Sequence, residues 1–239
     1  MSFVASIKIK TIAMKRYNIF YQVHKGLRAM LYENAILLQQ TDFSNDAELN
    51  IIASRISEVV SLFDKHAHSE DDNILTAIES FEPAVATLFA EEHVQDHELS
   101  NRLTAIINML HAAVTGEEKE ELGSALRVAY NAFVAFNLQH MAKEENELNQ
   151  LLWKHFSDED LHGITMQIIS KIPVDQLGAF NVWMIRGLSN NEIIHWLKQV
   201  KDSAPEPVFD GLMKVAETEL PESRFSIIAE SVTEGVLMA

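Results

Sequence analysis

The chain has 239 residues, 47 % of them hydrophobic, which is enough for one substantial core and excludes a disordered protein. Its 19 basic and 35 acidic residues leave a formal net charge of −16. So acidic a surface repels phosphate backbones and anionic lipids, and we expect neither a nucleic-acid nor a membrane partner. Cysteine is absent while there are 10 histidines, so a bound metal must take nitrogen and oxygen ligands.

The N-terminal segment carries little pattern. We expect residues 1–14 to be a tail or extension, because helical periodicity begins only after Met14. Lys8 and Lys10 interrupt the apolar core that a signal peptide would need, and no run of roughly 18 apolar residues, the length that spans a bilayer, occurs anywhere. These features predict a cytoplasmic protein.

Four long amphipathic segments follow the N-terminal tail. Apolar residues recur three and four positions apart over residues 15–40, 45–80, 83–116 and 117–156. Ser44 or Asn45 suits the N-cap of the second segment, and Pro83 suits the first turn of the third. The sequence therefore predicts an all-α protein with an antiparallel up-down four-helix bundle over residues 15–156.

The pattern changes after residue 156. Ser157 with Asp160, and Ser189 with Glu192, have the spacing of capping boxes, which mark helix starts. Four of the five prolines also lie in this part of the chain, at Pro173, Pro205, Pro207 and Pro221. We expect residues 157–239 to form several short helices.

The apolar stripe of each bundle segment continues into residue types that ligate metals. In the first segment Tyr17, Phe20, His24, Leu27 and Leu31 are spaced three, four, three and four, so His24 faces the core. The other three segments each contribute a pair of residues four apart, which point in similar directions from a helix. These pairs are His66 with Glu70, His93 with His97, and His140 with Glu144.

A cation would explain why these polar groups face the core. A buried carboxylate without a partner costs several kcal/mol or takes up a proton, so Glu70 and Glu144 need positive charge beside them. Imidazole nitrogen and carboxylate oxygen suit iron, manganese or zinc, and two bridging carboxylates suit a pair of ions. Five histidines would divide three to two, which leaves one ion with a position open to a small ligand.

Each signal also has an ordinary structural explanation. A single histidine on a helix seam is usually a hydrogen-bonded core residue, and polar pairs four residues apart are common on solvated helix faces. Glu91, Glu92 and Asp96 give His93 surroundings typical of the surface. The agreement of four segments nevertheless favours a metal site. The histidines without such a pattern, which we expect at the surface, are His68, His111, His155 and His162.

These residues resemble the hemerythrin-like, or HHE cation-binding, domain family over about residues 15–156. The resemblance rests on YQVHKGLR around His24, FDKHAHSEDD with His66 and Glu70, EEHVQDHEL with His93 and His97, and QHMAKEE with His140 and Glu144. It implies a bundle around a non-haem di-iron centre, with Glu70 and Glu144 as bridging carboxylates and the five histidines as terminal ligands. Two iron ions are the expected cofactor, ahead of zinc or manganese.

The chain departs from two groups within this family. Oxygen carriers have an Asp five residues after the last ligand histidine, whereas Glu144 stands at four and Glu145 at five. Proteins linked to the repair of iron centres have a cysteine-bearing segment, and this chain has no cysteine. The sequence is more similar to the wider group of bacterial HHE proteins, so we do not expect reversible oxygen transport.

We therefore expect a di-iron protein that binds O2, NO or a related small oxidant at an open iron position, for sensing, scavenging or iron handling. One alternative is a redox enzyme that reduces peroxide or NO. It would need a proton donor, for which Tyr17, Tyr21 and Tyr32 are candidates, although bundle packing is their expected role. Another alternative is an interaction protein whose metal only stabilises the bundle. The sequence leaves the oligomeric state open.

Overall fold

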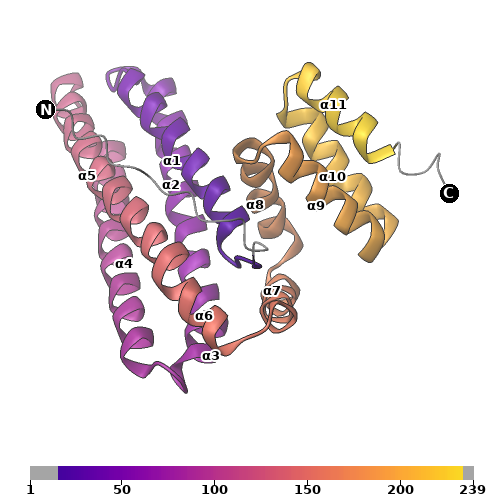
Figure 1. Cartoon of the computed structure of the whole chain (residues 1–239). Coiled ribbons are helices and arrows are strands. Elements are labelled where there is room, and N and C mark those ends of the chain that lie inside the picture. Colours follow the sequence, from indigo (N-terminus) through magenta and orange to yellow (C-terminus); the bar gives the residue numbers. More distant parts are fainter. Residues whose placement is uncertain (1–15, 234–239) are drawn as a thin grey trace, which may run out of the picture.

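Figure 1 shows the computed structural model, which describes residues 16–233. All regular structure in this range is helical, which confirms the predicted all-α class. The predicted tail at residues 1–14 lies outside the described residues. None of the described helices combines the length and the apolar character that crossing a membrane requires.

Four long helical arms run antiparallel and form the bundle (Figure 1). Two of the arms contain a π-helical turn, a wider turn than that of an α-helix. The arms are α1 (Tyr21–Gln40); α2 (Asp46–Ser69) with the π-turn η1 (Glu70–Leu75) and α3 (Thr76–Glu79); α4 (Pro83–Ala112); and α5 (Gly116–Lys143) with the π-turn η2 (Glu144–Leu148) and α6 (Asn149–His155).

Shorter helices follow the bundle, as predicted. They are α7 (Asp158–Lys171), α8 (Val174–Gly187), α9 (Asn190–Ser203), α10 (Glu206–Glu219) and α11 (Glu222–Thr233). The side chains of Ser157 and Ser189 accept hydrogen bonds from the backbone of Asp160 and Glu192, which completes both predicted capping boxes. Asn45 caps α2 by accepting from the backbone of Ala47.

Two hydrophobic cores divide the bundle along its length. The larger contains Leu27, Phe63, Leu103 and Phe133, and the smaller contains Phe20, Ile74, Phe89 and Leu148. Each arm carries one residue of each set, with Phe20 directly before α1. In the sequence, the predicted ligand residues of each arm lie between its two core residues. The polar residues of the four arms therefore meet in one layer between the two cores.

The C-terminal helices are attached to the bundle through α8, which lies along α1 (Figure 1). Phe180 and Trp183 of α8 belong to the larger core of the bundle. Arg55 of α2 and Arg186 of α8 both lie over the ring of Trp183, at 5.3 and 4.9 Å from its centroid. Beyond α8, Ile193, Leu197, Leu212 and Ile228 form a further core within α9–α11.

Two glycines allow α1 and α8 to approach closely. A Cβ atom at Gly26 would lie 2.8 Å from the backbone nitrogen of Met184, and one at Gly187 would lie 2.4 Å from the carbonyl oxygen of Lys25. Next to this crossing, Glu192 of α9 accepts hydrogen bonds from Lys25 and Tyr21, both at 2.6 Å. Although partial burial acts the other way, these contacts lower the pKa of Glu192 to about 2.

The close approach predicts that Gly187→Ala destabilises the fold by about 1–3 kcal/mol, because the added methyl group meets rigid backbone of α1. Gly211→Ala in α10 is the matched control. Nothing lies within 4 Å of its Cβ position, so alanine should raise stability by up to about 1 kcal/mol through helix propensity. Urea unfolding of the two variants and the wild type measures both changes. A Gly187→Ala chain as stable as wild type would contradict the prediction.

Candidate metal centre

Four histidines and two glutamates gather in the polar layer between the two cores. They come from all four arms of the bundle, and the most exposed among them is His66, at 9 %. Their nitrogen and oxygen atoms form two groups, each compact enough to surround one metal ion. The six residues are His24, His66, Glu70, His93, His140 and Glu144.

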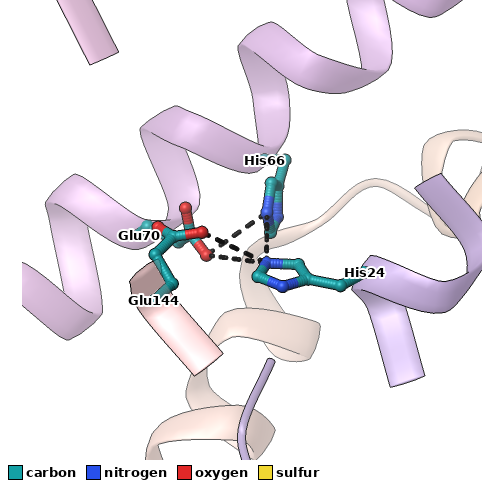
Figure 2. A group of neighbouring side chains, drawn as sticks. All are labelled: His24, His66, Glu70 and Glu144. Carbon is teal, nitrogen blue, oxygen red and sulfur yellow. Dashed lines mark hydrogen bonds and ion pairs between the residues drawn. The ribbon is translucent and has the colours of Figure 1, made fainter. Parts of the chain in front are cut away.

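The first group consists of His24, His66, Glu70 and Glu144, drawn in Figure 2. The Nε2 atoms of the two histidines lie 3.1 Å apart. Nε2 of His24 lies 3.7 Å from Oε1 of Glu70 and 3.3 Å from Oε2 of Glu144, and Nε2 of His66 lies 3.2 Å from Oε1 of Glu70. Two nitrogens and two oxygens thus converge on one point.

The second group contains the same two glutamates with His93 and His140. Nε2 of His93 lies 3.4 Å from Oε2 of Glu70, and Nε2 of His140 lies 3.1 Å from Oε1 of Glu144. Each carboxylate therefore presents one oxygen to the first group and its other oxygen to the second. This is the arrangement in which carboxylates bridge two ions.

Both glutamates are the first residue of a π-helical turn, Glu70 of η1 and Glu144 of η2. Such turns are rare in proteins, and those that occur are often found at functional sites. Each is preceded by a histidine four residues earlier and followed at once by a second acid, Asp71 or Glu145. That second acid crosses to the other half of the site, since Asp71 contacts His93 and Glu145 contacts His24. The site therefore consists of two similar halves.

Outer carboxylates fix the orientation of three imidazole rings. Their oxygens lie 3.0, 2.7 and 2.8 Å from the Nδ1 atoms of His24, His93 and His140. A carboxylate can only accept a hydrogen bond, so in each of these rings Nδ1 carries the proton and Nε2 faces the interior. The acids that do this are Glu145 for His24, Asp71 for His93 and Glu92 for His140. Asp71 and Glu92 each lie next to a predicted site residue, but helical periodicity does not identify them as part of the site.

The interior atoms of the cluster fit a cation. Both oxygens of Glu70, both of Glu144, and the Nε2 atoms of His93 and His140 are buried without a hydrogen-bond partner among the described residues. Such groups are costly unless something compensates them. One ion in each group, with a preference for nitrogen and oxygen ligands as iron, manganese or zinc have, would together satisfy all six atoms.

Without an ion, the histidines and carboxylates must neutralise each other. Burial alone would lower the pKa values of His93 and His140, but the surrounding carboxylates raise them to about 12 and about 9. Burial and the neighbouring His24 lower the pKa of His66 to about 4. Burial would raise the pKa of Glu70, but the charge of His66 and the nearby His24 and His93 hold it well below its usual value. A metal would replace these protons, so its binding should release them.

The structure does not bring His97 into the cluster. Its side chain is 61 % exposed and its Nδ1 atom lies 3.3 Å from Oδ1 of Asp64. After His93 the buried face of α4 continues at Asp96, three residues on, and then at Ser100. His97 lies two steps of four residues from Phe89, and this rotates it away from the core. His93, whose sequence neighbours suggested exposure, is buried. Each half of the site therefore has two histidines, and the predicted three-to-two division does not apply to this arrangement.

The three candidate proton donors are not among the six residues of the cluster. The hydroxyl groups of Tyr17 and Tyr21 contact Thr165 and Glu192, and the side chain of Tyr32 is exposed. Of the histidines expected at the surface, His68, His111 and His162 are exposed. His155 is partly buried and stacks on Phe81.

Comparison with known proteins is consistent with this geometry. Residues 16–161 match the hemerythrin HHE cation-binding domain. A zinc finger protein BRUTUS-like of Arabidopsis thaliana is 30 % identical over 212 residues, which cover 84 % of this chain and 16 % of the relative. Zinc finger protein BRUTUS of the same plant is 25 % identical over a match that covers 73 % of this chain and 14 % of the BRUTUS chain. F-box/LRR-repeat protein 5 of Danio rerio is 23 % identical over a match that covers 64 % of this chain and 22 % of the relative.

The chain thus spans less than a quarter of the length of each of these three relatives. The match to the BRUTUS-like protein covers more of the chain than residues 1–161 can supply, so it extends into the C-terminal helices. The similarity is therefore not confined to the four-helix bundle.

The contrast between His93 and His97, one turn apart on α4, predicts how metal binding responds to substitution. In a chelator-treated chain titrated with Co2+, His93→Ala should reduce the metal bound from about two ions to about one, because one group loses a nitrogen. His97→Ala should bind as wild type does. Melting temperatures should follow the same order, since bound metal stabilises the fold. Equal losses in the two variants would contradict the assignment.

Proposed function

Because the chain belongs to the hemerythrin HHE cation-binding domain family, we propose that its bundle holds two iron ions. His24 and His66 would be terminal ligands of one ion, His93 and His140 those of the other. The observation that carries this proposal is that Glu70 and Glu144 each present one oxygen to either histidine pair. The unsatisfied state of these oxygens among the described residues supports it further.

We propose that the iron pair binds O2, NO or a related small oxidant. Two histidines and two shared carboxylates give each ion about four protein donors, whereas iron commonly takes up to six ligands, so positions remain for a small molecule. Iron would supply the electrons and the open coordination positions for that ligand. The protein holds the imidazoles through outer carboxylates and excludes bulk water, since every residue of the cluster is buried.

A binding role is better supported than redox turnover. Turnover that consumes protons needs a donor beside the open position, and the three tyrosines considered for that task contact other groups or solvent. We propose that ligand binding serves sensing, scavenging or iron handling. An acidic surface with a net charge of −16 makes a nucleic-acid partner unfavourable.

Metal analysis combined with an optical spectrum tests the proposal. The chain, loaded anaerobically with Fe2+ and then exposed to air, should contain about two irons and show oxo-to-iron charge-transfer bands. Anaerobic NO should perturb the spectrum of the Fe2+ form. One zinc per chain, or no metal at all, would contradict the proposal.

Substitution of a bridging carboxylate should remove the pair. Glu70→Ala and Glu144→Ala should each lose iron and lower the melting temperature, because buried histidines then lack their compensating charge. Glu98→Ala, at an exposed position of α4, is the control and should retain two irons. Unchanged iron content in both bridging variants would show that the ligand assignment is wrong.

A further inference from the structure

The polar layer is closed to bulk water, so a metal ion needs a route into it. The six residues of the cluster are at most 9 % exposed, and a hydrophobic core lies on either side of the layer along the bundle. A cation gives up its hydration shell only where other polar groups replace the water. A route into the layer therefore requires polar side chains that lead from the surface to the cluster.

Three polar side chains on α2 and α4 form a group at the surface that the proposed function leaves unused. Nδ1 of His97 on α4 lies 3.3 Å from Oδ1 of Asp64 on α2, and Nδ1 of His68 lies 3.6 Å from the same oxygen. The side chains of His97, His68 and Asp64 are 61 %, 71 % and 39 % exposed. Two imidazoles from different helices thus share one carboxylate oxygen. We call these three residues the surface group.

The surface group has the donors of a weak metal site. Its imidazole nitrogens and carboxylate oxygen suit the same ions as the cluster does. The ring of His68 donates through Nδ1 to the carbonyl oxygen of Asp64 at 2.7 Å, so its Nε2 atom is the one available to an ion. The group is looser than the two buried groups, which are the ones in residues 16–233 that bring their ligand atoms within 4.8 Å of one another. Such a site suits capture and release of an ion.

The surface group adjoins a ligand of each half of the cluster. His97 is one helical turn from His93 on α4, and Asp64 and His68 stand two residues before and after His66 on α2. Neither His97 nor His68 is itself a member of the cluster. Each therefore lies beside a proposed ligand without taking its place.

A buried acid lies within electrostatic reach of both the surface group and the cluster. Asp96 of α4 is 4 % exposed and accepts a hydrogen bond from Asn137 at 2.6 Å. Burial raises the pKa of Asp96 and the charge of Asp64 adds to this effect. The hydrogen bond and the charges of His140 and His93 lower the pKa. Asp96 thus interacts with the outer acid and with two inner histidines.

The folded structure alone does not account for Asp96. No basic side chain in the described part of the chain forms an ion pair with it. A buried carboxyl group is costly, and such violations of core rules are expected at functional sites. One turn further along α4, the Ser100 hydroxyl is 2 % exposed and has no hydrogen-bond partner among the described residues. Asp96 and Ser100 therefore supply oxygen atoms inside the bundle that can replace the water ligands of an ion.

We propose that the surface group is an entry site, which captures a divalent metal ion and passes it by way of Asp96 to the buried cluster. The inference rests on the proposed metal pair and adds the residues that load it. The direction of transfer follows from affinity, because the cluster offers six ligand residues with two shared carboxylates and the surface group offers three. The surface group is empty again once the ion has reached the cluster.

Rates of metal uptake by the chelator-treated full chain test the inference. After rapid mixing with Co2+ at low concentration, His97→Ala and His68→Ala should each fill the cluster about threefold more slowly or worse, because the ion is no longer held at the surface. The visible absorption of bound Co2+ reports the rate. Both variants should still reach the wild-type number of ions and melting temperature, since neither residue belongs to the cluster. His111→Ala, at an exposed position near the C-terminal end of α4, is the matched control and should load at the wild-type rate.

Further variants separate one shared site from general attraction by surface charge. If both histidines hold the same ion, the double variant His68→Ala/His97→Ala should load about as slowly as the slower single variant, because residues that act as a unit do not have additive effects. Asp64→Asn should also load slowly. Glu98→Gln removes an exposed charge next to His97 and should change the rate by less than about twofold, because salt screens such charges.

Asp96→Asn tests the inner step of the route. The change keeps the shape of the side chain and removes its charge, so the variant should load more slowly and reach the wild-type number of ions. Its melting temperature shows that the fold is retained. Uptake at the wild-type rate in this variant would overturn the passage through Asp96.

Three results would overturn the entry site. They are wild-type uptake rates in the variants of the surface group, equal slowing in His111→Ala, and a wild-type rate that does not depend on Co2+ concentration. The last result would mean that opening of the bundle, and not capture at the surface, limits uptake. A wild-type chain that takes up no metal refutes the proposed function as well, whereas full uptake at unchanged rates refutes the entry site alone.

Discussion

The burial of two carboxylates between two hydrophobic cores is the constraint on which the rest of the structure depends. Glu70 and Glu144 are 2 % and 1 % exposed, in a layer where water cannot compensate their charge. Four imidazoles turn inward around them, and outer acids hold three of these rings in orientation. The bundle thus encloses two carboxylates whose negative charge must be compensated by protonated histidines or by a bound cation.

The sequence predicted much of this, because the determining signals are periodic. The four bundle segments, the capping boxes and the six candidate residues that the structure brings together follow from apolar spacing and from asking which residue comes next in phase. His97 lies outside the cluster for a related reason. Two steps of four residues were followed from Phe89, whereas the buried seam of α4 takes a step of three from His93 to Asp96.

Other features were beyond periodic reasoning. The π-turns at Glu70 and Glu144 change the helical phase, and a pattern based on 3.6 residues per turn does not report them. Their only trace in the sequence is the repeated spacing of a histidine, a glutamate four residues later and a second acid directly after it. The attachment of α8 to α1 was also missed, because long-range packing through Gly26 and Gly187 has no local signature.

That attachment gives α1 two duties within a few residues. His24 faces the polar layer, and Gly26, two positions further, touches the backbone of α8. Because α1 contacts both the polar layer and α8, the two contacts are energetically coupled. A change that stabilises the packing of α8 on α1 also stabilises the position of His24, and the reverse holds to the same extent. The free energy of packing the C-terminal helices against the bundle is therefore linked to that of binding a cation in the polar layer, although no described residue of α9, α10 or α11 belongs to the cluster.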